Sequence, residues 1–150
     1  MSRKQDILIN VLDDDLKRHG LLEQFFRPRL EAQITKRNIR FVRFLTADSL
    51  IDQLTEDAEA DTIVHVLFLD HDLGGEVYVD SGREDCGMEV VRAMEAYHYP
   101  HVLQTCVHTM NPMAGDEMRK RLQAAGYCHV RYVPFGVLIQ NWAGYNDDTD

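Results

Sequence analysis

Short apolar runs alternate along the chain with longer stretches in which apolar residues recur at helical spacing. Apolar runs of roughly four to eight residues predict buried strands, and spacings of three and four predict amphipathic helices. We expect strands over residues 7–12, 39–45, 63–69, 102–107 and 129–133, and helices over residues 19–36, 46–56, 87–98 and 112–125. This alternation of strand and helix favours an α/β domain built on a parallel sheet.

Two of the expected helices begin at residues that cap helices well. Thr46 and Asn111 each offer a side-chain oxygen to the free backbone amides of a first helical turn, and Pro112 suits the first helical position. Gly126 supplies a stop after the last of these helices. The second strand alternates arginine and phenylalanine only loosely, so we expect it at an edge of the sheet.

Three of the apolar runs end abruptly in polar residues that can carry chemistry. The first run stops at Asp13, Asp14 and Asp15, the third at Asp70, His71 and Asp72, and the fourth at His108, Thr109 and Asn111. The carboxyl ends of neighbouring parallel strands meet at one edge of the sheet, where such folds bind ligands. We therefore expect three aspartates, two histidines and a threonine from these strand ends to line one crevice.

The composition limits the kind of protein. A chain of 150 residues is most simply one domain, with 1–135 as the α/β unit and 136–150 as a short helix and acidic tail of the same domain. The formal charge of -9 argues against an extended nucleic-acid surface. No apolar stretch approaches the ~20 residues of a membrane span, and no signal core follows the first residues, so a cytoplasmic protein is expected.

Two segments leave alternatives open. The connection over residues 74–87 is longer than the usual ~2–6 residues and is a lid, a short hairpin or a tolerated insertion. After the last strand, Leu138, Ile139 and Trp142 either pack internally or form a dimer face.

The order of these motifs resembles a response-regulator receiver domain. Asp13 and Asp14 are similar to the receiver's metal-binding acidic pair, and Asp70 stands where the phosphoacceptor aspartate ends the third strand. Thr109 is similar to the hydroxyl residue after the fourth strand, and the proline–phenylalanine pair at 134–135 to the pair after the fifth. The resemblance implies a three-layer, flavodoxin-like α/β fold with a five-stranded parallel sheet in the order 2-1-3-4-5.

The chain also departs from that pattern. Val133 stands where receivers place the lysine that holds the phosphoryl group, which argues against aspartyl phosphorylation at Asp70. His71, Asp72 and His108 are additions at the strand ends. Together, the elements LDHDLG and HTMNP resemble the receiver offshoot called the cyclic-phosphate-processing receiver domain. That resemblance implies processing or sensing of a cyclic phosphate on a cyclic nucleotide or an RNA end.

Carboxylate oxygens are the ligands that Mg²⁺ and Mn²⁺ prefer, so Asp13, Asp14 and Asp70 are the expected metal ligands. The alternative is that only two of the carboxylates converge. If a histidine also binds the ion, the preference moves towards Zn²⁺ or Mn²⁺.

His71 and His108, with Asp70, are the expected catalytic residues, because an imidazole can take a proton from water and return one to a leaving sugar oxygen. The expected substrate-binding residues are Asp72, Arg83, Thr109 and Asn111. The simpler alternatives are that His71 bonds a backbone carbonyl, that Asn111 only caps its helix, and that Arg83 is solvated.

The leading expectation is a metal-dependent cyclic phosphodiesterase or phosphoesterase whose partner is a small phosphorylated ligand or cyclic nucleotide. The competing class is a non-catalytic receiver-like module that has lost phosphorelay activity and binds a protein, a ligand or a second copy of itself. A pure scaffold has no need of two added histidines at the crevice, which favours chemistry.

Overall fold

The structure, a computed structural model, describes residues 6–34, 36–74 and 79–140. Its elements follow in the order β1 (Ile7–Leu12), α1 (Leu16–Gln33), β2 (Ile39–Phe44), α2 (Ala47–Glu59), β3 (Val66–Leu69), α3 (Gly87–Tyr97), β4 (Thr105–Val107), α4 (Pro112–Ala124), β5 (Val130–Tyr132) and α5 (Phe135–Gln140). Each strand and helix expected from the sequence is present, and α5 is the short helix expected after the last strand.

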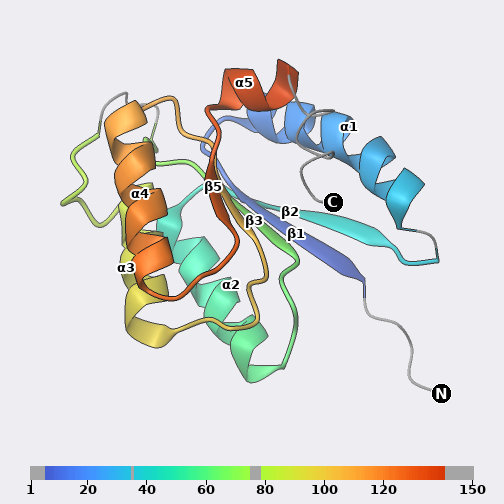
Figure 1. Ribbon diagram of the computed structural model, residues 1–150, viewed down its shortest axis with the longest axis horizontal. Coiled ribbons are helices and arrows are strands. Elements are labelled where there is room, and N and C mark those ends of the chain that lie inside the picture. The colour runs from blue at the N-terminus through green and yellow to red at the C-terminus, as the bar shows by residue number, and fades with distance from the viewer. Residues whose placement is uncertain (1–5, 35, 75–78, 141–150) are drawn as a thin grey trace.

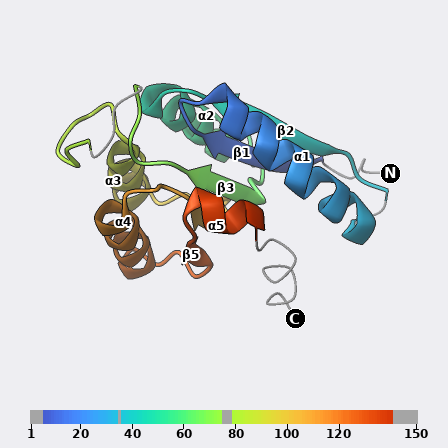
Figure 2. The same cartoon turned by 90° about the horizontal axis from the view of Figure 1, so that it is seen from above.

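The five strands form one parallel sheet in the order β2-β1-β3-β4-β5. Helices α1 and α5 cover one face of this sheet, and α2, α3 and α4 cover the other (Figure 1). Seen from above, α2, α3 and α4 follow one another in chain order (Figure 2). The predicted three-layer receiver-like fold is confirmed, and so is the position of β2 at an edge.

Strand β1 lies inside the sheet and is buried along its whole length. Leu8 and Leu12 belong to the core beneath α2, α3 and α4, whereas Ile9 and Val11 belong to the core beneath α1 and α5. The sequence of a strand that is covered on both faces is a continuous apolar run, because both sets of alternating side chains are buried. This packing fixes the carboxyl end of β1 deep within the molecule.

Helix α1 begins at Leu16, three residues before its expected start, because Asp15 caps it. The Asp15 side chain accepts a hydrogen bond of 2.8 Å from the backbone nitrogen of Lys17. The last aspartate of the acidic run therefore serves as a helix cap, and α1 starts immediately at the carboxyl end of β1.

The expected helix caps are confirmed. The Thr46 side chain accepts from the backbone of Ser49 at the start of α2, and the Asn111 side chain accepts from the backbone of Ala114 at the start of α4. Gly126 follows α4 with a φ of 100°, in the left-handed region that glycine tolerates.

Leu138 and Ile139 pack against the core beneath α1, so the internal alternative is confirmed for both. Trp142, the acidic tail and residues 75–78 of the long connection lie outside the described residues. Within the described part of the chain, no helix is long and apolar enough to cross a membrane.

Candidate functional site

Asp13, Asp70 and His108 meet at one edge of the sheet. Each is the first residue after its strand, and the three strands, β1, β3 and β4, are neighbours. The ligand atoms that the three side chains offer all lie within 4.8 Å of one another, and all three side chains are buried. The sheet thus brings together two of the three expected metal ligands and one of the two expected catalytic histidines.

Asp13 is held from two directions. Its Oδ2 atom lies 2.9 Å from His108 Nε2, and its backbone oxygen lies 2.7 Å from the Nε2 atom of His19, which is also buried. His108 Nδ1 is buried and has no hydrogen-bond partner among the residues that the structure describes. A carboxylate only accepts hydrogen bonds, so the Asp13 contact places a proton on His108 Nε2 and leaves Nδ1 as the unused ring atom.

The two carboxylates of this pocket differ in their readiness to ionise. Burial raises the pKa of Asp70 to about 6; the charge of His108 opposes this rise, and the charge of Asp13 adds to it. Burial also works to raise the pKa of Asp13, but the hydrogen bond and charge of His108 outweigh it and lower that pKa below its ordinary value. In the absence of a cation, Asp70 is therefore the carboxyl group that takes up a proton first.

Arg18 supplies a positive charge to this pocket that the sequence pattern did not predict. Its Nη1 atom lies 3.5 Å from Asp70 Oδ2 and 3.7 Å from Asp13 Oδ2, and its guanidinium carbon lies 5.5 Å from the centre of the Phe135 ring. The signal in the sequence was the capping Asp15. A helix that starts there places the residue three positions later in its first turn, beside the ends of the strands.

Asp14 lies outside the Asp13–Asp70–His108 group. It lines a cleft of about 510 Å³ whose other walls come from the start of α2 and from the loop after β3, including Thr46, Leu73 and Asp85. Its expected role as a metal ligand stays a prediction.

His71 belongs to a second cluster. Its Nδ1 atom lies 2.7 Å from Asp72 Oδ1, and its Nε2 atom lies 2.9 Å from Ser81 Oγ. Burial favours the neutral ring, but hydrogen bonds with Cys86 and Asp72 outweigh burial and raise the pKa of His71 above its ordinary value. The same contact with His71 holds the pKa of the Cys86 thiol below its ordinary value against the effect of burial.

The start of α4 is tied to this second cluster. Asn111 donates from Nδ2 to Asp72 Oδ1 at 3.4 Å, while its own Oδ1 caps the helix. Thr109 Oγ1 accepts from the backbone nitrogen of Asn111 at 3.1 Å, and both side chains are buried. Asn111 therefore does cap its helix, as the simpler alternative held, and it also reaches a site residue.

Arg83 lies on the long connection and is exposed. Its guanidinium group makes two hydrogen bonds to the Asp85 carboxylate, at 2.9 and 2.7 Å. Its expected closure over a phosphate stays a prediction.

Gly87 lets the beginning of α3 lie directly against the end of β3. Its backbone nitrogen donates to His71 O at 2.9 Å, and a Cβ atom at this position would overlap the carbonyl oxygen of Asp70. A larger residue would have to separate the helix from the strand end that carries Asp70.

Comparison with known proteins agrees with this architecture. Residues 9–124 match the family model described as a cyclic-phosphate processing receiver domain. Among solved structures, the chain is similar to the phosphorylated cyanobacterial phytochrome response regulator RcpA, with a TM-score of 0.62 and 14% identity over 95% of this chain and 92% of that one. At this identity the likeness shows the fold alone. The comparison with curated proteins gives no match.

Proposed function

Because this chain belongs to the family of cyclic-phosphate processing receiver domains, we propose that it opens a cyclic phosphate on a nucleotide or an RNA end, using a divalent cation held by Asp13 and Asp70. The observation that carries the proposal is the buried meeting of Asp13, Asp70 and His108 at the ends of three adjacent strands. This group combines ligands for a cation with an imidazole that can move a proton.

The donor set fits a divalent cation. Two buried carboxylates repel each other, and a cation between them relieves the repulsion that helps to raise the pKa of Asp70. Carboxylates alone suit Mg²⁺, whereas an added imidazole ligand favours Mn²⁺ or Zn²⁺. When bound, such an ion would polarise a phosphoryl oxygen and make a coordinated water more acidic.

His108 is the proposed proton carrier. Its contact with Asp13 fixes the ring, and Nδ1, which is buried and has no partner among the described residues, is the atom that would accept a proton from water and return one to the leaving sugar oxygen. His71 is less suited to this pocket, because Asp72 and Ser81 engage both of its ring nitrogens.

We assign to Arg18 the role of hydrogen-bond donor to the phosphate of the substrate. The Arg18 side chain is 32% exposed, so it can turn from the carboxylates towards a phosphoryl oxygen and offer paired N–H donors. This role compensates for Val133, which stands where receivers place a lysine.

Turnover of a substrate panel tests the proposal. Nucleoside 2′,3′-cyclic phosphates, an RNA ending in a cyclic phosphate, and cyclic dinucleotides are each incubated with Mg²⁺, Mn²⁺, Zn²⁺ or EDTA. We expect ring opening that requires a cation and falls by about 10²–10⁴-fold in His108→Gln, the usual contribution of a general acid–base. His129→Gln, which changes an exposed histidine, is the matched control.

The same panel separates the proposal from its competitor. Cation binding detected by a shift in melting temperature, without turnover of any substrate, would contradict hydrolysis and favour a non-catalytic binding module. Turnover that EDTA leaves unchanged would contradict the role of the cation.

A further inference from the structure

The side chains of Ser81, His71 and Asp72 form a continuous hydrogen-bonded series. Ser81 Oγ lies 2.9 Å from His71 Nε2, and His71 Nδ1 lies 2.7 Å from Asp72 Oδ1. A hydroxyl on one ring nitrogen and a carboxylate on the other is the arrangement by which serine hydrolases activate their nucleophile. None of the three residues belongs to the Asp13–Asp70–His108 group.

The Asp72 carboxylate determines which atoms donate and which accept in this series of hydrogen bonds. The carboxylate can only accept, so His71 Nδ1 carries the proton that they share. In the neutral ring, Nε2 then presents its lone pair and accepts from the Ser81 hydroxyl. Asp72 Oδ1 also accepts from the backbone nitrogen of Val79 at 2.9 Å and from Asn111 at 3.4 Å, which fixes the carboxylate in place.

Ser81 is positioned for access. Its side chain is half-buried, whereas His71 is fully buried. The backbone oxygen of Ser81 accepts from Arg92 Nη1 at 2.6 Å, which ties this loop position to α3. The neighbouring Cys86 is fully buried, so Ser81 is the more exposed of the two nucleophilic residues.

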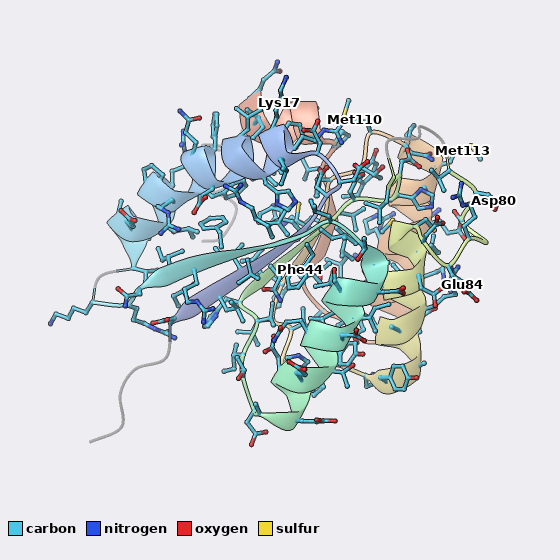
Figure 3. All side chains as sticks on the ribbon, turned by 180° about the vertical axis from the view of Figure 1, so that it is seen from behind. Lys17, Phe44, Asp80, Glu84, Met110 and Met113 are labelled. Atoms are coloured by element: carbon cyan, nitrogen blue, oxygen red, sulfur yellow. The ribbon has the colours of Figure 1, made fainter. Side chains whose placement is uncertain are left out.

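Two exposed methionines flank Asn111, the residue that contacts Asp72. Asn111, which contacts Asp72, is preceded by Met110 and followed two residues later by Met113, and these side chains are 52% and 85% exposed. Figure 3 shows Met113 and Asp80, the residue before Ser81, on the same side of the molecule. Exposed flexible methionines suit an apolar group of variable shape.

We propose that Ser81 and His71 form a second catalytic centre that hydrolyses carboxylic esters with an apolar acyl group, with Asp72 as the positioning residue. The reaction at this centre needs no cation, although the backbone nitrogen of His71 donates to Asp70 Oδ1 at 2.8 Å.

The chemistry at this centre has two stages. Ser81 Oγ attacks the ester carbonyl carbon as its proton passes to His71 Nε2, and collapse of the tetrahedral intermediate expels the alcohol, which takes that proton from Nε2. Water then attacks the acyl-serine while His71 Nε2 accepts one of its protons. The carboxylic acid is released as that proton returns to Ser81 Oγ, so no further reactant is needed.

A fluorophosphonate probe and an ester substrate test this assignment on the full chain. We expect the probe, in the presence of EDTA, to add one phosphonyl group to the peptide that carries Ser81, with loss of fluoride. 4-Nitrophenyl butyrate is expected to be hydrolysed under the same conditions. Ser81→Ala should abolish both signals, and His71→Gln should lower them by about 10²-fold or more.

Ser49→Ala is the matched control, because it removes an exposed hydroxyl elsewhere. Circular dichroism establishes that each variant is folded. If His71→Gln fails to fold because His71 is buried, the Ser81→Ala variant, which changes a half-buried residue, still tests the assignment. The assignment is overturned if folded wild-type protein is not labelled, if the label resides on Cys86, or if Ser81→Ala reacts like the wild type. Because EDTA is present throughout, the result does not depend on the cation site.

Discussion

His108 Nε2 lies 2.9 Å from Asp13 Oδ2, although the strands that carry these residues are not adjacent in the sheet. Strand β3 runs between them and ends at Leu69, immediately before Asp70. The bond therefore joins the two strands that flank Asp70, and all three side chains are buried. A change in the charge of any one of the three side chains consequently shifts the pKa of the other two.

Binding of a divalent cation is expected to release a proton near pH 6. Burial raises the pKa of Asp70 from 3.8 to about 6, so the group is largely protonated at about pH 5, and a cation must displace that proton. Affinity for Mn²⁺ should therefore rise by up to about tenfold per pH unit below pH 6 and level off above it.

Calorimetry at about pH 6 in two buffers of different ionisation enthalpy measures the released proton. Asp70→Asn should bind the ion weakly and release none, whereas Asp61→Asn, an exposed change, should behave like the wild type. Equal affinity for Mn²⁺ at about pH 5 and pH 7 would count against Asp70 as a ligand.

Arg18→Gln should tighten binding of the cation and weaken binding of phosphate. The guanidinium group lies 3.5 Å from Asp70 and 3.7 Å from Asp13, so it competes with an ion for their oxygens. At a partly exposed position this competition amounts to about 1 kcal/mol, or roughly fivefold in affinity. Titrations with Mn²⁺ and with inorganic phosphate measure the two effects separately.

Arg43→Gln is the control for this change, because Arg43 pairs with Glu23 instead. An Arg18 variant in which binding of the ion and of phosphate both weaken would indicate that Arg18 only supports the fold.

Gly87→Ala should destabilise the protein, whereas Gly20→Ala should stabilise it. A Cβ at Gly87 overlaps the backbone of Asp70, and the forced separation costs about 1–3 kcal/mol. Gly20 lies within α1 with open space around the same position, so alanine there adds about 0.5–1 kcal/mol through helix propensity. Urea unfolding of both variants measures the contrast, and equal effects would contradict the close contact at Gly87.

Asn10→Leu should stabilise the protein by about 1 kcal/mol. Asn10 is fully buried in β1, and neither polar atom of its side chain has a partner among the described residues. Replacing an unsatisfied buried amide by an apolar group of similar size removes its desolvation cost. The melting temperature should rise by about 2–4 °C, compared with little change in the exposed control Asn38→Leu. A lower melting temperature would show that the amide does have a partner.

The pattern of apolar runs ending in polar residues was sufficient to predict the buried strands, whereas the order of the strands in the sheet followed from the resemblance to receiver domains. The same rule predicted that Asp13, Asp70 and His108 would meet. Arg18 was not predicted, because its position depends on the start of α1, and that helix was expected to begin only at residue 19, without Asp15 as its cap.

His71 and Ser81 show a second limit of the sequence. Side chains of successive residues in an extended chain point to opposite sides, so the residue after Asp70 does not share its pocket. His71 instead meets Ser81, which is ten positions away in a connection without periodic pattern. Only the path of that connection in space brings the two residues together.

Because of the contact at Gly87, the amide proton of this residue reports on the separation of α3 from the end of β3. The amide of Gly87 donates to His71 O at 2.9 Å across the junction between α3 and β3. Exchange of this proton with deuterium requires the helix to lift away from the strand end that carries both Asp70 and His71. Its exchange rate therefore measures how often α3 separates from the strand end that supports both clusters, in the wild type and in variants, and needs no substrate.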